Sequence, residues 1–161
     1  MTLEQLATAA NHTNVRAFLR AIRLGEGTLD EAGYRRIVGD IPPHASMTSC
    51  ERHPNRRVWI RRYGVFSTAA GAYQITYPTW RGLVKQYHFA DFMPHTQDMA
   101  AVALIREKGA LEDVKAGRLS VAIDRCGALW ASLPSSKAGQ RKVSYAQVEN
   151  VYRDAGGTLT A

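Results

Sequence analysis

The sequence predicts an α+β fold, with helices toward both ends of the chain and a small antiparallel sheet between them. Apolar residues recur at helical spacing near the N-terminus and again throughout the second half, whereas residues 33–71 combine Gly, Pro and Ser clusters with short β-prone runs. The 161 residues are 45% hydrophobic, which is enough for one core, so we expect a single domain spanning residues 1–161. A cleft between sheet and helical lobe is then the natural place for a ligand.

The first predicted helix carries an apolar face in which residues recur at i, i+3, i+4 and i+7: Val15, Phe18, Leu19 and Ile22. Thr13 or Asn14 is the expected N-cap, and Gly25 the expected stop. In the middle region three β-prone runs predict the irregular sheet: "YRRIVG", "RRVWIRR" and "AYQITY".

The second half predicts four more helical features. Trp80, Leu83, Val84 and Tyr87 repeat the helical spacing after Pro78, and a second helix is expected from Gln97 to Lys108, with Thr96 as cap and Gly109 as stop. A third is expected from Leu119 to Ala131. Ser144 and Gln147 form a capping-box pattern for the last helix, which is expected to end at Gly156–Gly157 and to bury three residues: Tyr145, Val148 and Tyr152.

The net positive charge of the chain indicates which kinds of partner it can bind. A net charge of +7 and a pI near 9.7 favour a polyanion such as nucleic acid, anionic lipid or an acidic cell wall. The N-terminus "MTLEQLATAA" is no secretory signal, and no apolar run is long enough to span a membrane, so we expect synthesis in the cytoplasm without stable membrane insertion. Cys50 and Cys126 match no zinc or redox spacing; a buried free thiol is expected at Cys126, and a bond between the two stays open.

Glu26 is the principal candidate for catalysis. It lies between Gly25 and Gly27 at the end of the first predicted helix, where the negative end of the helix dipole disfavours an ionised carboxylate. Apolar surroundings would raise its pKa further. A carboxylic acid that keeps its proton near neutral pH is suited to protonate a leaving oxygen, as cleavage of a glycosidic bond requires.

Four segments, "VRAFLRAIRLGEGT", "GYRRIVGD", "STAAGAYQITYPTW" and "AIDRCGALWASLP", occur in the order and with spacing similar to those of the bacteriophage lambda endolysin family. The chain thus resembles these phage lytic transglycosylases from about Val15 to Leu159. The resemblance implies a lysozyme-like fold and cleavage of the bond between N-acetylmuramic acid and N-acetylglucosamine in peptidoglycan. It also implies Glu26 as the catalytic acid, and Tyr73 and Gln74 in the sugar-binding cleft, with Ser67 opening the same motif.

A transglycosylase of this family needs one carboxylate, whereas a hydrolytic glycosidase normally uses two. The acid protonates the glycosidic oxygen and then, as a base, helps the muramic C6 hydroxyl to attack C1, which yields a 1,6-anhydro sugar without water. Asp30 and Asp40 are the nearest alternatives for a second carboxylate, but both are expected to be turn residues. Gln74 has a plain alternative too, as an amide bonded to backbone.

The match departs from the family after "SLP", where Ala138 stands in place of an aromatic residue. This departure puts one sugar contact in doubt. Ser132 and Gln140 are further substrate-binding candidates in this loop, for which a simple connector is the alternative. The arginines of residues 52–62 are expected to form a solvated cationic face that speeds encounter with an anionic wall.

No cofactor is implied, and the histidines show no metal-binding spacing, so no metal is expected. We expect a monomer whose partner is the peptidoglycan glycan strand, and no nucleic acid. The resemblance also implies that the protein waits in the host cytoplasm until a holin-type membrane protein releases it to act in the periplasm.

Three other hypotheses stay open. The first is a muramidase that hydrolyses the same bond. The second is a basic nucleic-acid-binding module, because "TLEQLATAANHTNVRAFLRAI" resembles two short helices around a turn. The third is a catalytically inactive wall-binding domain. Product mass separates the first hypothesis, and a Glu26→Gln variant separates the second. The third would show binding to purified sacculi without soluble products.

Overall fold

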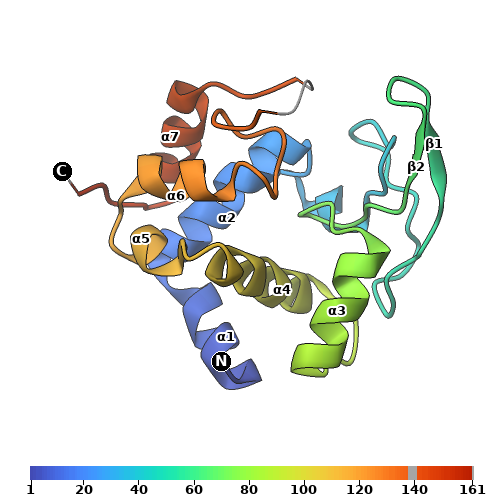
Figure 1. The fold of residues 1–161 in the computed structure, drawn as a ribbon, viewed down its shortest axis with the longest axis horizontal. Coiled ribbons are helices and arrows are strands. Elements are labelled where there is room, and N and C mark those ends of the chain that lie inside the picture. Colours follow the sequence, from blue (N-terminus) through green and yellow to red (C-terminus); the bar gives the residue numbers. More distant parts are fainter. Residues whose placement is uncertain (138–140, 161) are drawn as a thin grey trace.

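The computed structural model describes residues 1–137 and 141–160. Its elements follow in the order α1 (Leu3–Asn11), α2 (Thr13–Glu26), a 3₁₀ turn η1 (Glu31–Arg35), β1 (Val58–Ile60), β2 (Val65–Ser67), α3 (Tyr77–Tyr87), α4 (Pro94–Glu107), α5 (Leu111–Lys115), α6 (Leu119–Cys126) and α7 (Tyr145–Asp154). The predicted α+β class is confirmed, with helices on both sides of the sheet in sequence and the sheet at one end of the molecule (Figure 1).

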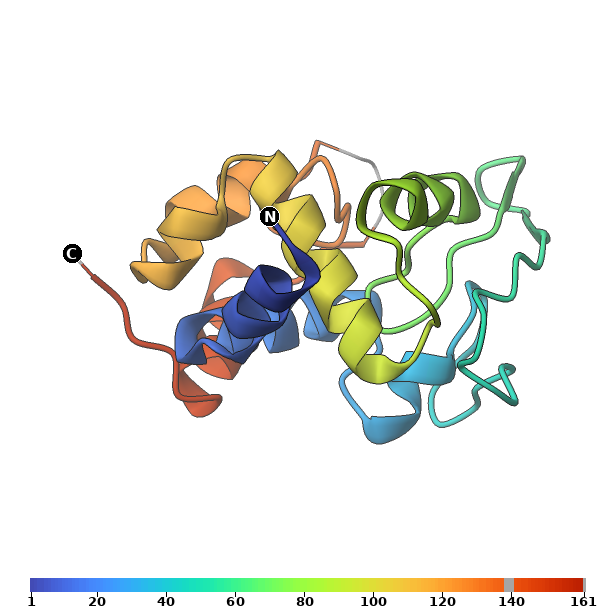
Figure 2. The ribbon, with the colours of Figure 1, turned by 90° about the horizontal axis from the view of Figure 1, so that it is seen from below.

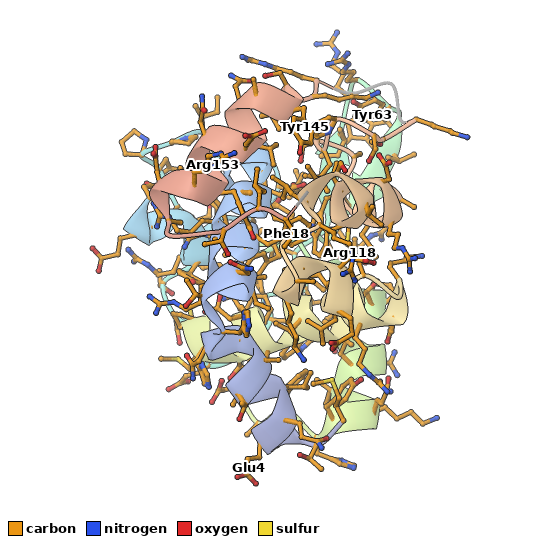
Figure 3. The ribbon with its side chains drawn as sticks, turned by 90° about the vertical axis from the view of Figure 1, so that its left-hand side faces the viewer. Glu4, Phe18, Tyr63, Arg118, Tyr145 and Arg153 are labelled. Carbon is orange, nitrogen blue, oxygen red and sulfur yellow. The ribbon has the colours of Figure 1, made fainter. Side chains whose placement is uncertain are left out.

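Helices α2 and α4 lie at the centre of the helical part. α2 packs against α7 and α5, and α4 packs against α1 and α3. Figure 2 shows α4 crossing the molecule between the other helices on one side and α3 with the hairpin on the other. Phe18 of α2 is fully buried and lies near the middle of the helical part in Figure 3. The core therefore sits around α2, and the far end of α2 carries Glu26.

The start of α2 differs from the prediction. His12 is the N-cap, and its Nδ1 accepts a hydrogen bond from the Asn14 amide at 3.2 Å. Asn14 is buried instead: its Nδ2 donates to the Lys115 carbonyl, and its Oδ1 accepts from the Thr158 amide. The expected cap at Thr13 or Asn14 was wrong, because tertiary contacts recruit the Asn14 side chain to join three segments of the chain.

The end of α2 differs by two residues. The helix continues through Gly25 and Glu26 and ends at Gly27, which takes a left-handed φ of 69°. A left-handed residue at this position is the usual helix stop and favours glycine. Of the two glycines beside Glu26, the second therefore ends the helix, and the expected stop at Gly25 was wrong.

The predicted sheet is smaller than the three β-prone runs suggest. β1 and β2 pair antiparallel with Trp59 opposite Phe66, so "RRVWIRR" is a strand as predicted. "YRRIVG" and "AYQITY" contribute only isolated bridges, Ile37 with Ala70 and Ala70 with Ile75. The chain from Thr28 to Thr76 is otherwise mostly irregular.

The later helices mostly follow the prediction. α3 buries Trp80, Leu83 and Tyr87, and Ser144 with Gln147 forms the capping box of α7. Three details were wrong. α4 begins at Pro94, so Thr96 lies within the helix and is not its cap. α6 ends at Cys126 and not at Ala131. Tyr145, expected to be buried, is 37% exposed.

Two helices lie outside the predicted set: α1, which appeared only in the nucleic-acid hypothesis, and the short α5. Cys50 and Cys126 are both buried free thiols, as predicted for Cys126.

Candidate active site

Glu26 is the last residue of α2, and its side chain is partly buried. Its Oε1 accepts a hydrogen bond of 2.8 Å from the Ser132 hydroxyl. Burial raises the pKa of Glu26 to about 7 and outweighs the lowering effect of that hydrogen bond. The carboxyl group is thus about half protonated at neutral pH, which is the expected property of an acid catalyst.

Gly25 allows Ser132 to reach Glu26. A Cβ atom at position 25 would lie 2.5 Å from the Ser132 Oγ, closer than any real side chain tolerates. Ser132 is itself buried, with 3% of its surface exposed. The loop after α6 therefore packs directly on the last turn of α2, and this contact joins residues 106 positions apart in the sequence.

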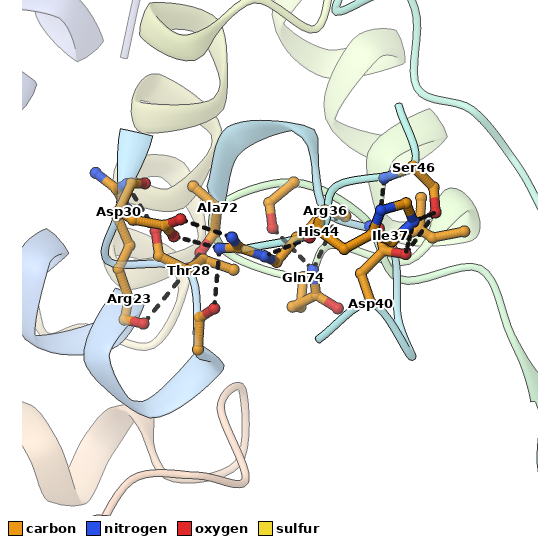
Figure 4. A network of polar contacts seen from close by, with 12 residues as sticks. Arg23, Thr28, Asp30, Arg36, Ile37, Asp40, His44, Ser46, Ala72 and Gln74 are labelled. Carbon is orange, nitrogen blue, oxygen red and sulfur yellow. Dashed lines mark hydrogen bonds and ion pairs between the residues drawn. The ribbon is translucent and has the colours of Figure 1, made fainter. Parts of the chain in front are cut away.

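The chain that follows Glu26 is held by two buried arginines (Figure 4). Arg23 donates from Nε and Nη2 to the Thr28 carbonyl at 2.9 and 2.7 Å, and its guanidinium lies over the Tyr34 ring. Arg36 donates to the carbonyls of Gly27 and His44 at 3.2 and 2.9 Å. These charge-assisted hydrogen bonds satisfy backbone groups that no helix or sheet satisfies, and they fix the backbone that follows the catalytic candidate.

The two carboxylates weighed as second catalytic groups are already engaged. Arg36 binds both oxygens of Asp30, and these hydrogen bonds hold the pKa of Asp30 below its usual value. Burial alone would raise the pKa of Asp40, but hydrogen bonds from Ser46 and from the Ile37 and Ser46 amides bring it below its usual value (Figure 4). Asp40 organises a turn, as its sequence context predicts, whereas Asp30 precedes η1 without a side-chain cap hydrogen bond and pairs with Arg36.

Tyr73 and Gln74 lie in the turn that follows Gly71. The Tyr73 side chain is only 2% exposed, and its hydroxyl donates to Asp98. Its ring thus presents almost no surface to a sugar, and it supports the turn from inside. Gln74 has a positive φ of 48°, and its Nε2 donates to the carbonyls of Gly71 and Arg36 at 2.9 and 3.3 Å. The backbone-bonded alternative for Gln74 is therefore the one observed, and a sugar contact through its Oε1 stays a prediction.

Of the other substrate-binding candidates, Ser67 lies within the described residues and Gln140 does not. Ser67 ends β2, is partly buried and accepts a hydrogen bond from the Ala69 amide at 3.2 Å. Gln140, together with Ala138, lies outside the described residues. Of the predicted set, the structure brings Glu26 and Ser132 into direct contact.

Asp98 of α4 is a group that the sequence analysis missed. It accepts hydrogen bonds from the hydroxyls of both Tyr34 and Tyr73, and burial raises its pKa. Nearby Gln97, fully buried, accepts from the Ala72 amide and donates to the carbonyls of Tyr34 and Phe92. These two residues attach the turn of Tyr73 to α4. Their signal in the sequence is weak, namely two polar residues at the start of an apolar helix.

Other features do not extend this site. Among the described residues no cluster of His, Cys, Asp and Glu is arranged to hold a metal ion. No helix in the described part of the chain is long and apolar enough to cross a membrane. A surface hollow of about 750 Å³ between α1, α4 and α5 includes none of the predicted site residues.

A partly buried acid at a helix end, in an α+β fold with one small sheet, is typical of a lysozyme-like protein, and comparison with known proteins agrees. A family model described as Endolysin matches residues 16–159. The chain is 41% identical to the endolysin of Escherichia phage P2, covering 91% of this chain and 94% of that protein. It is 35% identical to the endolysin of Escherichia phage lambda, covering 89% and 92%.

Two solved structures share the fold. The lysozyme of bacteriophage lambda complexed with a chitohexasaccharide matches with a TM-score of 0.82 and 33% identity, over 92% of this chain and 97% of that one. A second structure of lysozyme from bacteriophage lambda matches with a TM-score of 0.76 and 32% identity over the same shares. The chain belongs to the endolysin family: it has the lambda lysozyme fold and is an enzyme that acts on peptidoglycan.

Proposed function

We propose that this endolysin is a lytic transglycosylase. It cleaves the β-1,4 bond between N-acetylmuramic acid and N-acetylglucosamine and leaves a 1,6-anhydromuramic end. The observation that carries the proposal is the isolation of Glu26: it has a raised pKa near 7, whereas Asp30 and Asp40 are bound by other groups that lower their pKa values. Glu26 is the one carboxyl group of these three with a raised pKa. This fits a mechanism with one acid, whereas a hydrolytic mechanism normally needs a second carboxylate.

In the proposed reaction, protonated Glu26 gives its proton to the glycosidic oxygen as the bond from C1 to that oxygen breaks. The C6 hydroxyl of the same muramic ring then attacks C1, and its proton passes to the Glu26 carboxylate. The acid is thereby regenerated and no water is consumed. The nucleophile belongs to the reacting ring, so proximity supplies much of the rate. Ser132 donates a hydrogen bond to the ionised form and thus limits how far the pKa of Glu26 rises.

The substrate is the glycan strand of peptidoglycan, bound between the helical part and the sheet. The related lambda lysozyme structure is a complex with a chitohexasaccharide, which supports a sugar chain as the ligand class. We assign sugar contacts to Gln74 and Ser67, and to Gln140 through the family resemblance. Ser132, which was a further candidate, and Tyr73 are 3% and 2% exposed, so we assign them supporting positions. The protein acts as a monomer and needs no cofactor or nucleic acid. It reaches the wall in the periplasm from the host cytoplasm after a holin-type protein permeabilises the membrane.

Mass spectrometry of the muropeptides released from purified sacculi tests this proposal. Anhydromuramic ends, which lack one water relative to reducing ends, are expected as the main products. Reducing muramic ends would refute transglycosylation and leave a muramidase. The same assay with Glu26→Gln is expected to lose activity by about 10²- to 10⁴-fold, as is typical when a general acid is removed. The matched control is Glu107→Gln, an exposed residue at the end of α4, which is expected to keep full activity.

Binding measurements separate the remaining alternatives. An inactive wall-binding domain would bind sacculi without releasing soluble products. A nucleic-acid-binding module would bind duplex DNA with an affinity that Glu26→Gln leaves unchanged while the parent protein lacks lytic activity. Either result would overturn the proposal.

A further inference from the structure

The turn of residues 71–74 carries two neighbouring side chains with different surroundings. The Tyr73 side chain is 2% exposed, whereas Gln74 is only partly buried. The Gln74 amide nitrogen donates to two backbone carbonyls, and its Oε1 accepts no hydrogen bond from any residue that the structure describes. Gln74 therefore holds one free acceptor atom on a side chain that is otherwise fixed.

The conformation of Gln74 depends on support from its surroundings. Its φ of 48° lies in the left-handed region, which a residue with a Cβ atom adopts where neighbouring contacts enforce it. Beyond the bridge between Ala70 and Ile75 at its base, the turn is bound by side chains of other elements. Loss of one such contact is therefore expected to let the turn relax.

Two side chains from the region of the catalytic acid bind the backbone of this turn. The Thr28 hydroxyl donates to the Ala72 carbonyl at 2.5 Å (Figure 4), and the Trp130 Nε1 donates to the Tyr73 carbonyl at 3.0 Å. Thr28 follows the acid by two residues, and Trp130 precedes by two residues the serine that donates to the acid. These bonds join the turn to both segments that hold the acid, and neither of them involves Asp98.

Asp98 of α4 binds the same turn through a side chain. Its Oδ1 accepts a hydrogen bond of 2.5 Å from the Tyr73 hydroxyl and one of 2.9 Å from the Tyr34 hydroxyl. Hydrogen bonds from a hydroxyl to a carboxylate are short, and they are about twice as strong as those between neutral groups. The preceding residue, Gln97, accepts a hydrogen bond from the Ala72 amide. The buried end of Tyr73 is thereby attached to the central helix α4.

We propose that Asp98 is a positioning residue for glycan binding: it binds the Tyr73 hydroxyl and thereby holds Gln74 in the conformation that presents its Oε1 to the sugar chain. Asp98 itself does not touch the substrate. The inference rests on the proposed sugar contact of Gln74. Because Thr28 and Trp130 bind the turn independently of Asp98, its loss should loosen Gln74 without moving the catalytic acid. The expected signature is weaker substrate binding with an unchanged chemical step.

Kinetics on purified sacculi test the proposal with the whole protein, from rates of solubilisation over a range of sacculus concentrations. Tyr73→Phe removes only the hydroxyl and is expected to raise the apparent KM about fivefold, the equivalent of one hydrogen bond from Gln74 to a sugar. kcat is expected to change less than about twofold, as when an interaction shared by ground state and transition state is lost. Asp98→Ala should reproduce this change. Asp98→Asn, which keeps an acceptor oxygen at the same place, should restore most of the affinity.

Tyr34→Phe is the matched control. It removes the other hydroxyl from the same oxygen of Asp98, but Tyr34 lies in η1 and not in the turn. Its ring, over which the Arg23 guanidinium lies, is retained. The apparent KM is therefore expected to stay close to that of the parent protein. An equal rise in Tyr34→Phe and Tyr73→Phe would mean that the network gives only general support to the fold, and it would overturn the proposal.

A double variant tests whether Asp98 acts through Gln74. Gln74→Ala removes the proposed sugar contact and is expected to raise the apparent KM about fivefold. In that background Asp98→Ala should add little, because both substitutions remove the same interaction with the substrate. Additive losses in the double variant, or an unchanged KM in Gln74→Ala, would overturn the inference.

The pH–rate profile shows whether the turn acts on the acid instead. Its alkaline limb should stay fixed in Tyr73→Phe, because Ser132 still donates to Glu26 in that variant. A shift of the limb together with a fall in kcat would mean that the turn adjusts the acid, and the positioning role at Gln74 would be wrong.

Two further measurements separate this inference from loss of folding and from the catalytic proposal. Circular dichroism and urea midpoints show which variants are folded, and if Asp98→Ala does not fold, the comparison of Tyr73→Phe with Tyr34→Phe carries the test. Mass spectrometry of the released muropeptides should give the same products for every active variant. Reducing muramic ends from the parent protein would refute transglycosylation, while a KM effect confined to Tyr73, Asp98 and Gln74 would still support the positioning role.

Discussion

The helical part of this endolysin and the irregular stretch from Thr28 to Thr76 are stabilised by different means. Around α2 the buried residues are mainly apolar, and the helices satisfy their own backbone groups. In the stretch, few backbone groups pair in strands, and buried polar side chains take their place: Arg23, Arg36 and Gln97 each bind two or more carbonyl groups. Glu26 lies where the two parts meet, so its surroundings depend on both.

The difference explains the role of the two buried arginines, Arg23 and Arg36. A loop that is to position a catalytic group must be rigid, yet its carbonyl groups lose water when it packs on the core. A guanidinium group satisfies several carbonyls at once from one side chain. The stretch is therefore expected to be as well ordered as the helices but more sensitive to the loss of a single polar residue.

The largest effect on stability is expected from the helical part. Phe18→Ala removes a fully buried ring between the central helices and should lower the free energy of unfolding by about 4 kcal/mol. The matched control is Phe66→Ala in the hairpin, where the ring is 54% exposed and the loss should stay within about 0.5 kcal/mol. Urea denaturation measures both. Comparable losses at the two positions would contradict the division between core and hairpin.

Arg36→Met tests the irregular stretch. It leaves the carbonyls of Gly27 and His44 and the Asp30 carboxylate without their donor, and should cost about 3 kcal/mol. Hydrogen exchange should show the loss first at the Val38 and Gly71 amides, which bond within the stretch, and later in α4. Adjacent Arg35 is exposed, so Arg35→Met is the control and should have little effect. Uniform loss of protection in all elements would mean that the two parts unfold as one unit.

The same division explains what the sequence could predict. Helices α3 and α7 follow from local signals, apolar spacing and a capping box, and were predicted within a few residues. The β-prone run "AYQITY" became a turn, because Gly71 and Gln74 take positive φ angles and Gln97 binds the chain beside them. Contacts of that kind join residues far apart in sequence, and no local pattern reveals them.

In the candidate site, too, local signals were predictable from the sequence and long-range contacts were not. Two glycines around a carboxylate at a helix end indicated Glu26 and the direction of its pKa shift. The hydrogen bond from Ser132 depends on how a distant loop packs against Gly25, so the sequence pointed to Ser132 only through the family resemblance. The burial of Tyr73 was missed for the same reason, since Asp98 on α4 determines where its hydroxyl points.

The next largest effect concerns Glu26 and pH. Its pKa of about 7 in the folded protein lies above the ordinary value of 4.5, so the folded state binds the proton more tightly. The stability of the parent protein should therefore fall as pH rises from about 4.5 to about 7, by about 2 kcal/mol through this group. Glu26→Gln removes that penalty, so the variant should be more stable than the parent at pH 8 and about equal at pH 4. Urea midpoints at the two pH values measure this difference, with Glu107→Gln as the control. An equal difference at both pH values would show that Glu26 has an ordinary pKa.

The smallest expected effect concerns the hydrogen bond from Ser132 to Glu26. Ser132→Ala removes the donor that stabilises ionised Glu26, so the pKa of Glu26 should rise above about 7. Activity requires the protonated acid, and hence the alkaline limb of the pH–rate profile should move upward by about 0.5 to 1 unit. Gly25→Ala should move it in the same direction, because its Cβ would displace the Ser132 hydroxyl. Ser135→Ala is the control, since Ser135 lies in the same loop as Ser132 but its hydroxyl donates to the Ile123 carbonyl of α6 and does not contact Glu26. A profile that stays fixed in Ser132→Ala, or moves equally in Ser135→Ala, would mean that packing of the loop as a whole, and not this one hydrogen bond, adjusts the acid.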